Sequence, residues 1–415
     1  MKKCGFFLSL VVFVLLTLHS SQAFAVSLGD CKALALKNSS LIAAYEDLIK
    51  SSVYSWRKER SALLGQLTAY YQPDNIQFSD RSDLKRTHGF ETRMGAAFSW
   101  DLQKILTDYP ALGRLDVTKN KLVLSIARSE LLKNVTQDYD RLYVLLEKRK
   151  EYVNVLELFQ SHIREIKQLQ SKGVDAAFDL DRARVQFQSL NISLNNIDSE
   201  IKDVLLALNS LMNSSYTQRD FSLKDAPDMS SLPSWSGDYS VLQQSRLDKV
   251  NVDTAKEMFK QSRLYYLPTV QLGLEHNVNT VDPNVEEYRS YLSLNFDIFD
   301  FGQKANEEKS LKYGYEYQEK LFKDDQRKLK VRIEQMTGDL ASLRGVYRAT
   351  MENLKNAQAG IKTARAYYRQ GKIKEIDLLS AFSDYLTAVD QSYDAQYNFL
   401  AKKAELAAVI EGNRP

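Results

Sequence analysis

The pattern of apolar and polar positions divides this chain into short alternating segments and long helical tracts. Apolar and polar residues alternate from 288 to 299, and after Gly302 the period becomes helical. A period of two residues is typical of a strand with one apolar and one polar face. Residues 90 to 100 alternate in the same way, over the roughly 9 to 11 residues that a tilted membrane strand needs. Two shorter alternating segments bring the predicted strands to four, near 66–72 and 270–275.

Long helices are predicted for the two tracts without proline, 111–226 and 284–414, because proline breaks helix interiors. The helical period dominates from about 112 to 172. From Leu142 to Ile166, residues recur at alternating steps of three and four, which is the spacing of a coiled-coil seam, interrupted once by Arg149. Gly173 is predicted to end this helix. A return helix to about 212 is then predicted to begin at Asp175 or Asp179.

The second half of the chain repeats this plan. A helix is predicted from 302 to 370, ending at Gly371, and another from 375 to 411. Shorter helices are expected at 27–63 and 239–263. Polar stretches at 73–88 and 276–287 are expected to be solvated loops.

The two predicted hairpin turns can be matched at one constant offset, which indicates an internal two-fold repeat. The corresponding residues are Gly173, Asp179, Leu180 and Ala183 in the first half and Gly371, Asp377, Leu378 and Ala381 in the second. We therefore expect four regions in the chain. They are a signal peptide at 1–25, a first repeat at 26–212, a linker at 213–238 and a second repeat at 239–415.

The N-terminus has the pattern of an export signal: a basic start, a short apolar run and an A-x-A cleavage motif at Ala23 and Ala25. The apolar run is short against the ~20 residues of a membrane-spanning helix, so an uncleaved anchor is the less favoured alternative. Cleavage would leave Cys31 as the remaining cysteine, with no partner for an internal disulfide. We expect Cys31 to be a small residue on a short helix.

Charge and motifs exclude several functions. With 56 Lys plus Arg against 53 Asp plus Glu, the chain is nearly neutral, so nothing favours binding to nucleic acid. No spacing of Cys or His suits a metal, and no phosphate-binding glycine loop or nucleophile-and-base arrangement is present. We expect neither enzyme activity nor a cofactor.

Four strands cannot close a membrane barrel, because such barrels begin at about eight strands. Open edges in a bilayer would leave backbone groups unpaired. Several copies must therefore share one barrel, and three copies would supply twelve strands. The predicted fold class is thus an α+β membrane protein with long helical hairpins and four strands per chain in a shared barrel.

The chain resembles the TolC family of outer-membrane efflux proteins over essentially its whole mature length. The resemblance rests on the early Ala-Leu cluster before Asn38, the Phe299-Asp300-Phe301-Gly302 corner, the Gly371 turn with Asp377 to Ala381, and the doubled plan. It implies a homotrimer in the outer membrane of a Gram-negative bacterium, with a twelve-stranded β-barrel and a long periplasmic α-barrel. It also implies a periplasmic adaptor and an inner-membrane pump as partners.

The resemblance implies a periplasmic gate as well, narrowed by acidic residues after the second hairpin turn. Asp377 matches one such position and Ser380 stands where some members carry a second acid; Asp179 is a weaker candidate. Alternatively, Asp377 only complements the helix dipole. Candidates for adaptor contact are Lys172, Gly173, Gly371, Lys372 and Lys374, although a solvated turn would explain them too. The strand-to-helix corner is assigned to Asp297, Phe299, Asp300 and Gly302.

The leading hypothesis is a passive exit duct of a tripartite efflux or type I secretion system, embedded in outer-membrane lipid. The alternative is an exported periplasmic coiled-coil protein, structural or adaptor-like, that enters no membrane and needs no alternating strands. An exported binding protein or hydrolase would need a concave polar site, for which the sequence gives no sign. Drugs, metal ions and proteins all remain open as cargo.

Overall fold

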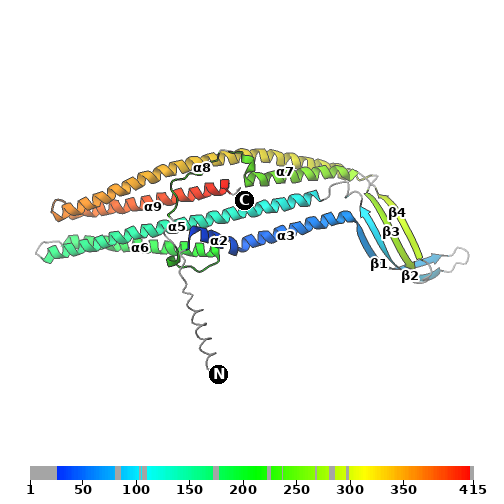
Figure 1. The fold of residues 1–415 in the computed structure, drawn as a ribbon, viewed down its shortest axis with the longest axis horizontal. Helices are drawn as coiled ribbons and strands as arrows, with labels where there is room; N and C mark the ends of the chain where they lie inside the picture. The colour runs from blue at the N-terminus through cyan, green and yellow to red at the C-terminus, as the bar shows by residue number, and fades with distance from the viewer. Residues whose placement is uncertain are drawn as a thin grey trace, which may run out of the picture. The chain divides into compact units, whose positions relative to one another are not determined.

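The computed structural model describes residues 26–79, 86–101, 104, 110–171, 177–221, 226–235, 237–266, 269–279, 286–295 and 299–411. Helices and strands follow one another in the order expected for two similar halves (Figure 1). The first half contains α2 (Leu28–Asn38), α3 (Ser40–Ser61), β1 (Gln66–Ser79), β2 (Arg86–Asp101), α5 (Ala111–Ser171) and α6 (Ala177–Met212). The second contains α7 (Gln243–Ser262), β3 (Thr269–Asn279), β4 (Glu286–Asn295), α8 (Gln303–Arg369) and α9 (Glu375–Glu411).

The chain folds into two compact units, each of which draws on both halves of the sequence. Unit 1 contains the chain up to Ile42, Ala127–Gly237 and the chain from Val331 onward. Unit 2 contains Ala43–Ile126 and Asp238–Lys330. The four predicted regions of the sequence stay a prediction.

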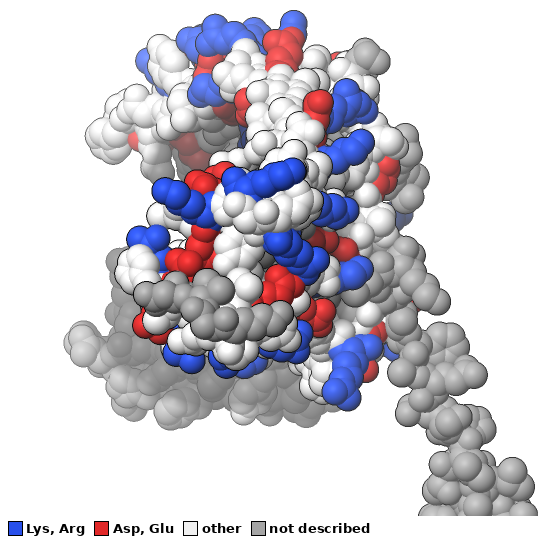
Figure 2. Space-filling model, turned by 90° about the vertical axis from the view of Figure 1, so that its left-hand side faces the viewer, with Lys and Arg blue, Asp and Glu red and all other residues white. Residues whose placement is uncertain are grey.

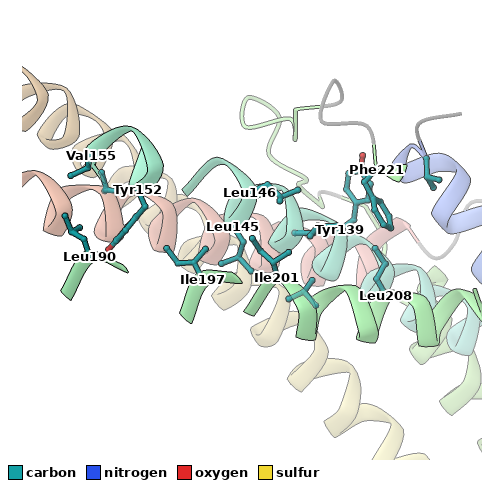
Figure 3. Close-up of a cluster of buried hydrophobic side chains, with 14 of the residues drawn as sticks. Tyr139, Leu145, Leu146, Tyr152, Val155, Leu190, Ile197, Ile201, Leu208 and Phe221 are labelled. Atoms are coloured by element: carbon teal, nitrogen blue, oxygen red, sulfur yellow. The ribbon is translucent and has the colours of Figure 1, made fainter. Parts of the chain in front are cut away.

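The core of unit 1 lies along the predicted seam of α5. Of the predicted seam positions, Leu142, Leu145, Tyr152, Phe159 and Ile166 are buried, at 6% exposure or less, while Arg149, Leu156 and Ile163 are half-buried. Ile166 packs in a separate cluster with Leu180 and Ala183 of α6. The other four buried positions pack against a row on α6, also spaced by three, four and seven residues, as in a coiled coil (Figure 3). That row includes Leu190, Ile197, Ile201, Val204 and Leu208.

The predicted linker is partly packed rather than free. Phe221 is buried, and its ring lies edge-on to Tyr139 of α5 at 6.3 Å. Its backbone forms a parallel bridge with Val26, just before α2. In α2, Cys31 is fully buried, which confirms its expected place on a short helix, and burial raises the pKa of its thiol to about 12.

Unit 2 contains an antiparallel sheet with the strand order β1-β2-β3-β4. The register places Leu67 beside Phe98, Phe98 beside Leu274, and Leu272 beside Leu292, so these side chains share one face. The other face is more polar. Among the described side chains, the apolar face carries Leu67, Ala69, Tyr71, Ala96, Phe98, Leu272, Leu274, His276, Tyr288, Leu292 and Leu294, with Ser290 as a polar exception. The polar face carries Gln66, Thr68, Ser99, Arg289, Ser293 and Asn295, together with Tyr70, Gly95, Ala97, Gly273 and Tyr291.

Each strand extends further toward its connecting loop than predicted. The loops expected at 73–88 and 276–287 were therefore predicted too long, which was wrong. β1 continues to Ser79 and β2 already begins at Arg86. Pro73 is accommodated because β1 is an edge strand, where a missing N–H need not interrupt a ladder. Similarly, β3 runs to Asn279 and β4 begins at Glu286. Polar composition suggested loops here, but backbone pairing does not require apolar side chains.

The strand expected at 288–299 also ends earlier than predicted, at Asn295. Phe299 therefore lies outside the sheet. The helix boundaries, by contrast, agree with the prediction to within a few residues, including those of α5, α8 and α9. In the described part of the chain, none of the helices combines the length and apolarity that a bilayer crossing requires.

One buried carboxyl in the core of unit 1 should make stability depend on pH. Asp140 of α5 is 5% exposed, and burial raises the pKa of its carboxyl to about 7, against the opposing charges of Lys32 and Lys403. The folded chain then holds this proton more tightly than the unfolded chain does. The free energy of unfolding consequently falls as pH rises from about 4 to about 7.

We therefore expect Asp140→Asn to stabilise the protein at pH 8 and to have little effect at pH 4.5. A pKa raised by about three units corresponds to at most about 4 kcal/mol. Urea denaturation at both pH values measures the effect, with the exposed Asp203→Asn on α6 as the control. An equal change for Asp140→Asn at both pH values would contradict the assignment.

Candidate functional site

The second hairpin turn is closed by the glycine predicted to end α8. Gly371 has φ +69°, and its N–H donates to the carbonyl of Tyr368 at 2.9 Å. The N–H of Lys372 donates to the carbonyl of Tyr367 at 2.9 Å. These two bonds form a Schellman motif, which needs a left-handed residue and so favours glycine. The ammonium of Lys372 lies 5.5 Å from the centre of the Tyr367 ring.

Asp377 lies in the first turn of α9 and caps its start. The carboxylate of Asp377 accepts the backbone N–H of Lys374 at 3.1 Å, and the carbonyl of Lys374 accepts the N–H of Asp377 at 3.1 Å. The helix-end role considered for this residue is therefore present in the structure. Asp377 and Ser380 are nevertheless exposed, and they are one helical turn apart on the same face. A gate role for them stays a prediction.

The remaining predicted residues differ in how exposed they are. Lys372 and Lys374 are exposed, while Asp179 is half-buried in the first turn of α6. Burial and Glu375 raise the pKa of Tyr368 on α8, and the charge of Asp179 raises it further. The two hairpins therefore approach each other near their turns. Outside the described residues lie Lys172, Gly173, Asp297, Ala23 and Ala25.

A buried polar contact joins the hairpins at this end of unit 1. His162 of α5 is 1% exposed, and its Nε2 lies 2.8 and 2.9 Å from the two carboxylate oxygens of Glu375, which is 3% exposed. The ring of Tyr368 on α8 lies edge-on to His162, with the ring centres 5.0 Å apart. Burial and the Glu375 carboxylate raise the pKa of Tyr368 above its usual range. Three helices thus meet around one carboxylate.

An outer ion pair and an aromatic contact surround this centre. Arg369 of α8 pairs with Glu165 of α5, and Arg365 lies 3.8 Å from the same carboxylate. Partial burial works against ionisation of Glu165, but the hydrogen bond and charge of Arg369 outweigh it and lower its pKa. Next to His162, the rings of Phe159 and Phe382 lie 4.1 Å apart. The hairpin contact therefore combines one buried polar pair with apolar packing and a more exposed ion pair.

Hydrophobic periodicity does not reveal the pair between His162 and Glu375. The partners are 213 residues apart, and each occupies an ordinary position in a helical pattern. A histidine among apolar seam residues, close to Ile163 and Ile166, was the one available hint, and it names no partner.

A groove runs between α6 and α9 beside the turns. Its volume is about 620 Å³, and its lining includes Phe178, Arg182, Val185, Ile376, Leu379 and Ser380. Phe178 is 67% exposed, with the guanidinium of Arg182 4.3 Å from the centre of its ring. Figure 2 looks onto this end of the molecule, where acidic and basic side chains are interspersed with uncharged ones.

The strand-to-helix corner is held by Asp300. Its two carboxylate oxygens accept the backbone N–H groups of Gly302 and Lys304, each at 3.0 Å, and the Lys304 bond is the main cause of its lowered pKa. The turn places Phe301 at φ +54° and Gly302 at φ +83°. A left-handed conformation costs a residue with a side chain about 1–2 kcal/mol, which makes Phe301 a strained position.

No group of three or more His, Cys, Asp or Glu residues suited to a metal occurs among the described residues. Unit 1 therefore offers a capped turn, a buried contact between hairpins and a groove, and unit 2 separately offers a clamped corner.

Comparison with known proteins supports the fold described above. Residues 246–412 match the family model of the outer membrane efflux protein. No curated protein is similar enough in sequence to count as a relative. Among solved structures, CusC aligns with a TM-score of 0.83 at 15% identity, covering 93% of this chain and 92% of that one.

Two further solved structures, each described as an outer membrane channel, show the same fold. CmeC of Campylobacter jejuni has a TM-score of 0.79 at 14% identity, covering 93% of this chain and 86% of its own. MtrE of Neisseria gonorrhoeae, in its open state, has a TM-score of 0.78 at 15% identity, covering 92% and 88%. The resemblance and the fold class predicted from the sequence are thereby confirmed, whereas a trimeric barrel lies beyond what one chain displays.

Double-mutant cycles should separate the buried pair from the exposed one. Removing one partner of a buried pair costs about 3–5 kcal/mol, because the other is left uncompensated. Exposed pairs contribute at most about 1 kcal/mol. We expect His162→Ala and Glu375→Ala to be strongly coupled and Glu165→Ala and Arg369→Ala weakly coupled in the free energy of unfolding, measured by urea denaturation. Equal coupling in the two cycles would show that burial does not strengthen the inner contact.

Proposed function

We propose that three copies of this chain form a channel across the outer membrane of a Gram-negative bacterium and extend it into the periplasm. The channel would be a passive exit duct, with energy supplied by a pump elsewhere. One observation carries the proposal: the four-stranded sheet has an exposed apolar face, a more polar opposite face and two open edges. A catalytic role is not part of the proposal, because the matching channels are not enzymes.

The apolar face of the sheet fits a lipid environment. Leu67 is 73% exposed, Leu292 63% and Leu294 56%, although large apolar side chains on a sheet normally lie against a core. A contiguous exposed apolar surface indicates contact with a membrane or another protein. Alternation of apolar and polar faces along strands of ten residues or more is the pattern of outer-membrane barrels.

The open edges fit a shared barrel. β1 and β4 are the outer strands, and each pairs with another strand on one side. Unpaired backbone groups in a bilayer cost several kcal/mol each, so the edges must be closed. Pairing β4 of one copy with β1 of the next closes the ring, and three copies supply twelve strands.

A stripe on α6 supports contact between copies in the helical part. Phe178, Val185, Ile192 and Leu206 are 61–68% exposed and separated by seven or fourteen residues. Such spacing puts them on one side of the helix, away from the buried row that meets α5. A neighbouring copy would cover this stripe. An exported coiled-coil protein without a barrel, the competing hypothesis, would leave both the stripe and the sheet face in water.

The proposed partners are a periplasmic adaptor and an inner-membrane pump, of either a tripartite efflux or a type I secretion system. Similarity to efflux channels supports the first of these. The second hairpin turn supplies exposed ammonium groups on Lys372 and Lys374 for an adaptor to bind. Selection of cargo would belong to the pump.

Neighbouring substitutions on β4 test the membrane assignment. Leu292 lies on the apolar face and Ser293 on the polar face. A lysine facing lipid costs about 2–4 kcal/mol near the middle of the bilayer. We expect Leu292→Lys to abolish most insertion into liposomes, while Ser293→Lys inserts as trimers that conduct ions, judged by native mass and single-channel recording. If wild-type and both variants stay monomeric and water-soluble, the channel proposal fails.

The gate is tested by ion selectivity. Asparagine keeps the acceptor that caps α9 but removes the charge of Asp377. In water-like surroundings a nearby charge contributes about 1 kcal/mol, so we expect Asp377→Asn to reduce the cation-to-anion permeability ratio about fivefold. Ser380→Asp should raise it. The exposed Asp203→Asn on α6 serves as the control, and an unchanged ratio for Asp377→Asn would leave this residue with its helix-end role.

A further inference from the structure

A cavity lies between α5 and α8 in unit 1. Its volume is about 370 Å³, within the roughly 300–1,000 Å³ of pockets that take small molecules. Residues between 151 and 158 of α5 line one side, residues between 358 and 369 of α8 line the other, and Tyr385 of α9 completes the lining. The cavity therefore spans both hairpins, because α5 belongs to the first and α8 and α9 belong to the second.

The floor of the cavity is apolar. Val155 of α5 is fully buried and Ile361 of α8 is 3% exposed, and both belong to the hydrophobic core of unit 1. Leu158, which also lines the cavity, is half-buried and packs against the same core. An alkyl chain on this floor would remove apolar surface from water, which is favourable.

Three cationic side chains line the cavity from α8. They are Lys362, Arg365 and Arg369, separated by three and four residues. This spacing places them on one side of the helix. Guanidinium and ammonium groups on one side of a small cavity suit a carboxylate or phosphate, which a guanidinium binds with two parallel hydrogen bonds.

The carboxylates near these cations do not balance them. Arg365 and Arg369 share the carboxylate of Glu165, with Arg365 at 3.8 Å. Glu151, which lines the cavity from α5, already accepts the hydroxyl of Tyr385 at 2.8 Å. Among the residues that the structure describes, Lys362 has no ion-pair partner. Three cations thus face two carboxylates, and both carboxylates are already engaged.

The excess of positive charge acts on a partly buried group. The side chain of Arg365 is 19% exposed. Burial and the charge of Arg369 lower the pKa of its guanidinium, while Glu165 acts in the opposite direction. A further anion beside Arg365 would offset both unfavourable effects on its charge.

We propose that this cavity binds a single-chain amphiphilic anion, with the alkyl chain on the floor formed by Val155 and Ile361 and the anionic head between Lys362 and Arg365. Charge complementarity favours an anion, and the apolar floor favours one with an alkyl chain. The proposal does not depend on the channel function proposed above. A ligand in this place would touch both hairpins and so add to the contact between them.

Photolabelling tests the site. The full chain, purified in a neutral maltoside detergent, would be irradiated with an octanoate analogue that carries a diazirine at the end of its chain, and labelled peptides would be identified by mass spectrometry. We expect label within 151–158 and 358–366, and its suppression by excess octanoate or octyl phosphate. Octyltrimethylammonium, which has the same alkyl chain and a positive head, should suppress it far less.

Two charge reversals on α8 show whether the cations of the cavity are responsible. We expect Lys362→Glu to reduce labelling about tenfold, because like charges then repel where a charge-assisted hydrogen bond formed before. Lys355→Glu is the matched control: it lies two turns earlier on the same helix, is also exposed, and does not line the cavity. It should label like the wild-type protein.

The other outcomes overturn the proposal. Equal labelling of both variants and wild type, or equal suppression by octyltrimethylammonium, would show that the site selects an alkyl chain without regard to charge. Equal loss in the two variants would indicate general attraction by α8 rather than a site. Labelling does not require conducting trimers, so failure of the channel proposal would leave this inference standing.

Discussion

The structure depends on one constraint, the need to pair the backbone groups along the outer edges of β1 and β4. Within one chain the sheet cannot close, because its order is linear and its four strands are too few. The same strands expose an apolar face that no described residue covers in full. In the proposed channel, closure with further copies would answer the first problem and lipid would answer the second.

The helical unit solves a different problem, which is to hold two hairpins together. Contacts within a hairpin are largely apolar, as along the seam between α5 and α6. Between the hairpins, polar contacts recur: Tyr152 with Asp390, Tyr385 with Glu151, and finally His162 with Glu375 near the turns. Polar pairs are specific in geometry, and at the buried pair of His162 and Glu375 removal of one partner is expected to be far more disruptive than loss of an exposed ion pair.

The corner between sheet and helix joins a strained turn to the start of a helix. Asp300 satisfies backbone donors at the start of α8, where helices leave N–H groups unpaired, and thereby stabilises a turn that Phe301 alone would disfavour. The motif noticed in the sequence is thus a cap with a strained neighbour. Its aspartate is explained by the local backbone.

The sequence by itself determined the features that follow from hydrophobic periodicity and from the positions of glycine residues. It predicted the long helices, the four strands, the turn at Gly371 and the resemblance that the fold comparison confirmed. It misplaced the polar strand ends near Pro73, because edge-strand pairing tolerates residues that suggest loops. Only the tertiary structure decided the sheet order, the partner of His162 and the exposure of Phe301. Periodicity describes neighbours along the chain, whereas pairing and burial depend on residues hundreds of positions away, which a local pattern does not encode.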